Sequence, residues 1–356
     1  MKLLDLSKNT YNKFRERLTP QGEHDGTLRG RLIQIIPIVL VIIILTQLIL
    51  AYLWSIEPER FDINQRSATL AETRNETITT GYTTISTLII TAETLLDKPG
   101  GYLSNDVMPP TSLADDIPNW EFGVLTQIRD LTLALRNDFT RSQSQSVEDK
   151  DVIAADNLFR IDSESWLLPS AEGEYRKGLN ALYRYLARLT DQGAHNAQFY
   201  ARADNLNVWL GLISKRLGSL SQRLSASVSK THLNIDLAGD ANAEQSTPTH
   251  KEVNVKTPWL KIDNVFFEAR GSAWALRHLL LAAQVDFKSI LENKNAQVSL
   301  QQIIHELEST QDTVYSLAIL NGNGFGLFAN HSLVMANYIS RANAAVIDLR
   351  QLLKQG

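Results

Sequence analysis

Residues 32–54 read LIQIIPIVLVIIILTQLILAYLW, and no charged residue falls between Arg31 and Glu57. About 20 apolar residues in a helix, each adding about 1.5 Å, cross the hydrocarbon core of a bilayer, which is about 30 Å thick. The stretch therefore predicts a transmembrane helix over residues 32–54. Thr46 and Gln47 interrupt it with polar side chains. They could bond to a partner helix, but for Thr46 a local bond to the helix backbone is the simpler interpretation.

The charge on either side of this stretch predicts its orientation. Residues 1–31 hold seven Lys and Arg residues against four acidic ones. Because basic flanks stay in the cytoplasm, we expect residues 1–31 to form a cytoplasmic tail and the C-terminal part to lie in the periplasm. The apolar run is too long for a typical signal peptide and no cleavage motif of small residues follows it, which indicates an uncleaved anchor. Residues 1–18 suggest a basic amphipathic helix on the inner leaflet of the membrane.

The composition excludes several classes of function. The chain has 356 residues and a net charge of −4, and the part after residue 31 carries −7. A mildly acidic domain argues against nucleic-acid binding, which needs a basic face. The absence of cysteine excludes disulfides, zinc–thiolate sites and thiol catalysis.

After the span, apolar or small residues recur at alternating spacings of four and three. Such seams begin near residues 78, 125, 175, 199, 262, 303 and 335, and the cleanest run is Phe199, Ala203, Leu206, Leu210, Ile213, Leu217, Leu220 and Leu224. This spacing keeps one stripe of a helix against its neighbours. We therefore predict an all-α protein, in which one N-terminal transmembrane helix is followed by an elongated antiparallel bundle of about seven helices.

Breaks in the pattern divide the bundle. Ser170, after Pro169, is a candidate N-cap, and Pro258 is a candidate first residue of another helix. Residues 229–256 are polar and aperiodic, which predicts a loop or linker. The predicted organisation is a bundle part over residues 57–228, this linker, and a second bundle part over residues 257–356.

Catalytic motifs are weak in this chain. Among seven His residues none forms an H-E-x-x-H pair, so we predict no metal site and no cofactor. Residues 227–230 match S-x-x-K by spacing, but the partner motifs of penicillin-binding enzymes are missing.

Two stretches are candidates for a binding surface. Residues 97–123 read as a long loop with aromatic and acidic residues, and residues 136–146 end a helix with charged and polar ones. The candidate residues are Tyr102, Asp106, Trp120, Glu121, Arg136, Asp138 and Arg141. The alternative, which we favour, is that the loop caps the end of the bundle and buries Tyr102 and Trp120.

Several long runs carry a family resemblance: LLDKPGGYLSNDVMPP, LRNDFTRSQSQS, FYARADNL, NVFFEARGSAWAL and FGLFANHSLVMANYISRANAAVIDLR. They resemble the bacterial family catalogued as domain of unknown function 2333, from the span to nearly the end of the chain. The resemblance implies a proteobacterial inner-membrane protein of unassigned function. It supplies no catalytic residues.

Three functions remain open. The leading hypothesis is a membrane-anchored envelope scaffold or adaptor that binds an envelope protein, and a homo-oligomer is left open. The second is a periplasmic ligand- or lipid-binding module with a cavity between helices. The third is an envelope-acting hydrolase with Asp106 and Glu121 as acid and base. A filled bundle favours the first, a continuous apolar cavity the second, and carboxylates around a polar cleft the third.

Overall fold

The structure, a computed structural model, describes residues 28–356 apart from 107, 112–115, 142–146, 192, 194–195, 229, 234–251, 317, 324–326 and 356. The chain forms two compact units, Met1–Leu50 and Ala51–Gly356. The amphipathic segment predicted at residues 1–18 lies outside the described residues.

The first helix is α2 (Leu28–Trp54), which continues through Pro37. Residues 35–54 of this helix are long and apolar enough to cross a membrane, and none of them is buried. Thr46 Oγ1 donates to the Ile42 carbonyl at 2.8 Å, which confirms the local bond expected for Thr46. A helix with these properties near an N-terminus is a membrane span or a signal sequence.

Residues 51–356 form an all-α bundle, as predicted. Its α-helices are α3 (Ile63–Arg74), α4 (Tyr82–Asp97), α5 (Asp116–Ala134), α6 (Lys150–Phe159), α7 (Ala171–Thr190), α8 (Ala203–Ser225), α9 (Ile262–Asp286), α10 (Lys288–Asn293), α11 (Gln297–Ser309) and α12 (His331–Lys354). A π-helical turn, η2 (Leu135–Phe139), extends α5, and a 3-10 turn, η3 (Trp259–Lys261), precedes α9. Within the described residues, seven of these helices correspond to the seven predicted seams.

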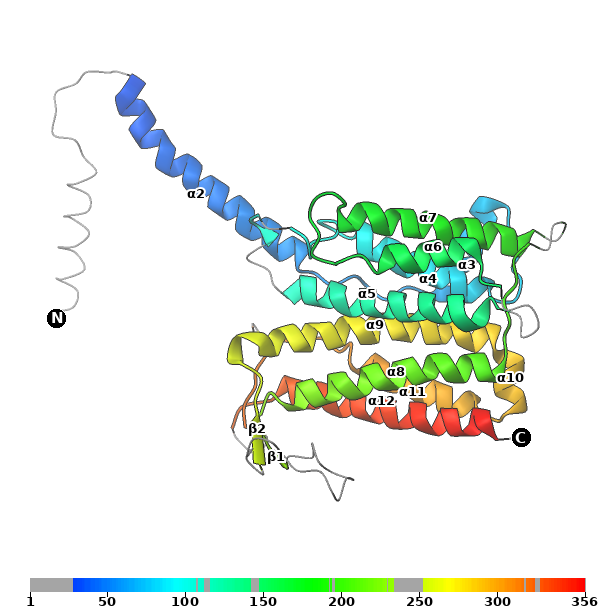
Figure 1. The fold of residues 1–356 in the computed structure, drawn as a ribbon. Helices are drawn as coiled ribbons and strands as arrows, with labels where there is room; N and C mark the ends of the chain where they lie inside the picture. The colour runs from blue at the N-terminus through cyan, green and yellow to red at the C-terminus, as the bar shows by residue number, and fades with distance from the viewer. Residues whose placement is uncertain are drawn as a thin grey trace, which may run out of the picture. The chain divides into compact units, whose positions relative to one another are not determined.

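The helices pack in two layers that meet along α5 and α9 (Figure 1). In one layer α4 and α6 pack against α7, and in the other α12 packs against both α8 and α11. Helices α8 and α12 are antiparallel, because Ser214 bonds to Asn343 and Ser221 to the Ala336 carbonyl. Helices α5 and α9 instead run in the same direction. The structure thus combines antiparallel pairs with a parallel pair at the layer boundary.

Most of the predicted seam positions form the core. In α9, for example, Phe266, Ala269, Ala273, Leu276, Leu280 and Ala283 are all buried. Where α5 and α9 end, the centroid of the Phe139 ring lies 5.5 Å from that of Phe287 and 5.3 Å from that of Phe199. The alternating spacing therefore identified the faces on which the helices pack.

Other expectations were wrong in detail. Ile78, expected to begin the first seam, precedes α4 and is exposed. The seam that begins at Ile303 was expected to include Thr310 and Val314, but α11 ends at Ser309. The stretch expected to be a loop over residues 97–123 ends earlier, because α5 begins at Asp116 and places Pro118 in its first turn. Proline is tolerated there, since the N–H groups of a first turn have no partner within the helix. The short helices α3 and α6 were not predicted, and the helix expected to continue to about residue 293 is divided at Phe287 into α9 and α10.

Local capping explains several helix starts. Ser170 accepts a hydrogen bond from the Gly173 N–H at 3.3 Å, which confirms it as the N-cap of α7. At α4 the cap comes from another helix, because the Asp286 carboxylate accepts from the N–H groups of Gly81 and Thr84 at 2.9 and 2.6 Å. Burial raises the pKa of Asp286, and these donors oppose that rise. The end of α9 is thereby fixed to the start of α4.

Residues 229–256 are not entirely without regular structure. Their ends form an antiparallel strand pair, β1 (Lys230–Leu233) with β2 (Glu252–Val255), in which Lys230 lies opposite Val255. Residues 234–251 lie outside the described part of the chain. The helices before and after this segment pack into one compact unit, because α12 lies against α8 and α9 against α5.

Candidate functional site

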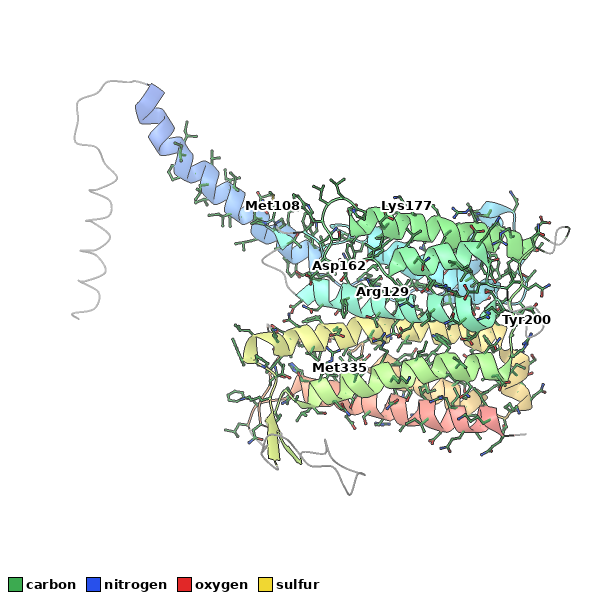
Figure 2. All side chains as sticks on the ribbon, viewed as in Figure 1. Met108, Arg129, Asp162, Lys177, Tyr200 and Met335 are labelled. Carbon is green, nitrogen blue, oxygen red and sulfur yellow. The ribbon has the colours of Figure 1, made fainter. Side chains whose placement is uncertain are left out.

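The structure separates the seven candidate residues into two groups at opposite ends of α5. Four of them, Tyr102, Asp106, Trp120 and Glu121, belong to its beginning, and Arg136, Asp138 and Arg141 to its end. At a helical rise of about 1.5 Å per residue, Trp120 and Arg136 are about 24 Å apart along the axis. In Figure 2 the labelled Met108 and Asp162 mark the first end and Tyr200 marks the second. The candidates therefore belong to two separate surfaces.

At the first end, a buried ion pair fixes the chain between α4 and α5. Lys98 and Glu121 form a salt bridge with side chains that are 1% and 0% exposed. Glu121 also accepts from the N–H groups of Leu103 and Ser104, at 2.9 and 2.8 Å. Burial raises the pKa of the Glu121 carboxyl, while Lys98 and the other donors oppose that rise. The carboxylate oxygens thus hold the 98–104 segment onto α5.

The aromatic candidates are buried beside this ion pair. The Tyr102 hydroxyl donates to the Ser163 carbonyl at 3.1 Å, and its ring packs edge-on against Tyr175. Trp120 lies 5.2 Å from Trp274 of α9, measured between ring centroids. In this arrangement the segment covers the end of the bundle.

Asp106 is the exposed member of the first group. It lines a recess of about 490 Å³ together with residues from the starts of α5 and α9, including Phe122 and Asn264. Glu121 does not line this recess, because its oxygens face Lys98 and the 103–104 backbone. The two carboxylates that the third hypothesis, a hydrolase, would use as acid and base therefore face different surroundings.

Arg270 of α9 joins three segments at the same end of the bundle. Its guanidinium pairs with Glu57 at 2.6 Å and donates to the carbonyls of Thr310 and Asp312 at 3.1 and 2.8 Å. Burial raises the pKa of Glu57, and Arg270 opposes the rise. Arg270 thereby fixes the residues that follow α2 and those that follow α11 to one helix.

Two recesses flank the segment that Arg270 holds. The first, called here the apolar recess, measures about 450 Å³ and has Phe266, Val314, Met335 and Tyr338 in its wall, beside Arg270 and His331. The second measures about 520 Å³ and is lined by residues that follow α2, by the start of α9 and by residues 313–319. Both open at the bundle end that receives the chain from α2.

His278, two turns after Arg270 in α9, binds the segment that follows α2. Its Nε2 accepts from the Phe61 N–H at 3.2 Å, and its Nδ1 lies 2.7 Å from the Trp274 carbonyl, so the proton resides on Nδ1. The Phe61 ring stacks on the imidazole at 4.0 Å. Burial, helped by the nearby charge of Arg277, lowers the pKa of His278 to about 4.

This histidine predicts a loss of stability in acid. Because its folded pKa is about 4 and its ordinary value is 6.5, the unfolded chain takes up a proton first as the pH falls below 6.5. We expect this group to lower the free energy of unfolding by about 2 kcal/mol between pH 8 and pH 5. His278→Gln should remove this part of the loss. Denaturant titrations of both proteins at the two pH values measure it, and equal losses would contradict a neutral, buried His278.

At the second end, the remaining candidates belong to a network of charges. Arg136 bonds to Glu148 at 3.2 Å and to Asp156 at 3.1 Å, and Asp156 also bonds to Arg160. Burial raises the pKa of Asp138, and the charge of Arg141 opposes the rise. The π-helical turn η2 includes two of these candidates, and such turns are frequent at functional sites.

A polar recess lies beside this network and is called here the distal recess. It measures about 640 Å³, and its wall includes Thr140, Val147, Glu148, Lys150, Arg188, Gln198 and Tyr200. Arg188 pairs with Asp149 and Asp151, both at 2.7 Å. Burial acts to raise the pKa of Asp151, but Arg184 and Arg188 outweigh it and lower the pKa. These charges are paired within the chain, whereas Val147 and Lys150 are exposed.

Sequence reasoning missed Lys98, Arg270 and His278, which hold this architecture together. Lys98 stands next to a Pro-Gly-Gly turn and reads as solvated, and the other two lie within a helical pattern. Their partners are distant in the sequence, so no local spacing marks them.

Comparison with known proteins adds the family. A search of curated proteins and a search of solved structures each found no match. One family model matches residues 27–356, the span region and the whole bundle together. The chain therefore belongs to the family described as an uncharacterized protein conserved in bacteria (DUF2333).

Proposed function

We propose that this protein is a single-pass protein of the bacterial inner membrane whose periplasmic bundle is a scaffold that binds an envelope protein. The observation that carries the proposal is the filled bundle. Its core is packed with buried apolar side chains along α4, α5, α7, α8, α9, α11 and α12, and its recesses lie at the two ends. A bundle with a filled interior offers a partner its outer surface and has no large internal cavity for a substrate among the described residues.

Anchoring and orientation rest on the sequence. Residues 35–54 are long and apolar enough to span a membrane, and a flank with seven Lys and Arg residues precedes them. Under the positive-inside rule this arrangement leaves the bundle in the periplasm. Within the bundle, the distal recess lies at the end opposite to residues 55–57, where the predicted span stops.

The distal recess is the surface that we assign to the partner. It combines an exposed apolar side chain, Val147, with an exposed cation, Lys150, above a framework of paired charges. Polar rims around a few apolar anchors are typical of protein interfaces. The paired Arg188 and Asp149 keep this framework rigid, so binding needs little ordering of the surface.

Photocrosslinking in cells tests this assignment. A photoreactive amino acid is placed at Val147 in the full-length protein, and at Val208 as the control, because Val208 is an exposed valine on α8 outside the recess. We expect a protein adduct at Val147, identified by mass spectrometry, that is lost when Lys150→Glu is added and kept when Lys215→Glu is added. Equal adducts at Val147 and Val208 would contradict a binding surface at the distal recess.

The apolar recess favours a second candidate, the binding of a lipid or another apolar ligand. It combines apolar walls with Arg270 and His331, which suits a chain with an anionic or polar head. Met335→Trp fills this space without adding charge. Native mass spectrometry should then show a bound ligand on the original protein and none on the variant, and a ligand retained by both would place it elsewhere.

A further inference from the structure

Exposed apolar side chains gather at one end of the bundle. They include Trp166, Leu168, Trp259, Tyr315, Leu327 and Phe328, called here the tip residues, and each is more than half exposed. They come from the loops between α6 and α7, before α9, and between α11 and α12. Isolated exposed apolar residues are ordinary, but a cluster drawn from separate loops marks a contact surface.

These loops share the end of the bundle at which α2 stops. The Trp54 ring is so close to Gly100 that a Cβ built on that glycine would lie 2.8 Å from it. Asn105, in the same segment as Gly100, donates to the Ser165 carbonyl at 3.2 Å, next to Trp166. In Figure 1 the first residues of α5, α7, α9 and α12 all lie at this end.

The recess of about 520 Å³ shows that the loop before α9 and the loop between α11 and α12 also lie at this end of the bundle. Ser55 and Ile56 line it together with Asp263, which follows η3, and with Val314, which precedes Tyr315. Because the predicted span ends at Trp54, this end lies at the membrane surface whatever direction the rest of α2 takes. The tip residues are therefore within reach of a bilayer before any partner arrives.

The kind of residue distinguishes this end from the other. Among the described residues outside α2, the exposed large aromatic side chains belong to this end, including Phe122 in the second turn of α5. At the opposite end the exposed apolar residues are aliphatic, such as Ile78, Val147 and Val298. Trp and Tyr are the residues that concentrate at membrane–water interfaces, because their rings are apolar and their N–H or O–H groups are polar.

Two of the tips are short uncharged stretches: residues 165–169 read SWLLP and residues 327–329 read LFA. At the third tip, Trp259 lies between two basic residues, Lys256 and Lys261. Leu168 is 89% exposed at a φ of 55°, a left-handed conformation that disfavours residues with a Cβ. Neither its packing nor its backbone explains a leucine at this position, whereas a contact outside the bundle does.

We infer that the tip residues insert into the interfacial layer of the outer leaflet, so that the bundle stands on the membrane by this end. The inference rests on the proposed anchoring by α2. That anchor holds the tips next to the bilayer at high effective concentration, so a modest apolar contact is enough to keep them inserted. In this arrangement the bundle is held upright, and the distal recess points into the periplasm.

Depth measurements on the full-length protein test the inference. The chain has no cysteine, so single Cys residues carry an environment-sensitive fluorophore at chosen sites. Labels at Leu168 and Leu327 probe the tips, labels at Val147 and Val298 are exposed controls at the other end, and a label at Leu45 reports the span. The protein is reconstituted into vesicles of zwitterionic lipid, with or without a lipid that carries a nitroxide near its headgroup.

We expect the nitroxide lipid to quench the tip labels and the span label and to leave both distal labels unchanged. Trp166→Ser with Trp259→Ser should reduce quenching at Leu327 and not at Leu45. Both replaced residues are exposed, and a thermal melt checks that the variant remains folded.

Tip labels that escape quenching while Leu45 is quenched would overturn the inference and leave the anchoring intact. Tip labels whose emission shifts to the blue without quenching by the nitroxide lipid would also overturn it, because a second copy of the protein would then cover them. A Leu45 label that escapes quenching would overturn the anchoring, and the inference with it.

Discussion

Replacing Glu121 by glutamine should lower the free energy of unfolding by about 3–5 kcal/mol, the usual loss when one partner of a buried ion pair is removed. The glutamine side chain would keep the shape of the glutamate and could still accept from the Leu103 and Ser104 N–H groups. It would leave the Lys98 ammonium, which is 1% exposed, without a counter-charge. The loss therefore comes from the uncompensated cation and not from an empty space.

A double variant separates this cause from simple disruption of the loop. Lys98→Met removes the ammonium and keeps an unbranched apolar chain in its place. We expect Lys98→Met with Glu121→Gln to be more stable than Glu121→Gln alone, because no charge remains buried. Denaturant titrations of the three proteins measure the coupling. Losses that simply add would show that Lys98 and Glu121 do not interact as the structure places them.

The second large effect is expected where α5 and α9 approach most closely. A Cβ built on Gly271 would lie 2.1 Å from the Trp120 carbonyl oxygen, and one built on Gly123 would lie 2.1 Å from that of Glu268. Backbone cannot yield as a flexible side chain can, so the helices must separate. Gly271→Ala should lower the free energy of unfolding by about 3 kcal/mol, at the upper end of ordinary overpacking.

Gly218 of α8 is the matched control, because it is also a glycine inside a helix. A Cβ at Gly218 would meet Asn343 at 3.6 Å, an ordinary contact. Gly218→Ala should therefore raise the free energy of unfolding by about 0.5–1 kcal/mol through helix propensity. Opposite signs for the two substitutions are the expected result of a thermal melt series. Stabilisation by both would mean that α5 and α9 do not meet at Gly271.

Much of the architecture followed from local sequence. The apolar run over residues 32–54, the seams of seven helices and the Ser170 cap depend on neighbours within a few residues, where helical periodicity and capping act. The same reasoning explains the errors. Residues 116–123 contain a proline and polar residues, yet α5 begins there because its partner α9 buries Trp120 and Val124. Packing outweighed the local preference for a loop.

The candidate site shows the limit of that reasoning more clearly. The sequence indicated that residues 97–123 and 136–146 were unusual, but it placed Tyr102 and Arg136 in one set. The structure places them at opposite ends of α5, with the first group near the chain that leaves α2 and the second beside the distal recess. A helix of about 20 residues separates its ends by about 30 Å, so proximity in sequence did not give proximity in space.

The sequence alone determined that the chain is helical, that residues 32–54 can span a bilayer, and which face of each long helix is apolar, because these properties repeat within one or two helical turns. The tertiary structure decided that α5 runs parallel to α9, that Lys98 pairs with Glu121, and that His278 receives Phe61. It also brought exposed aromatic residues from three loops to one end of the bundle. Each of these joins segments far apart in the chain, and the free energy of such contacts comes from burial and pairing that exist only after the helices have packed.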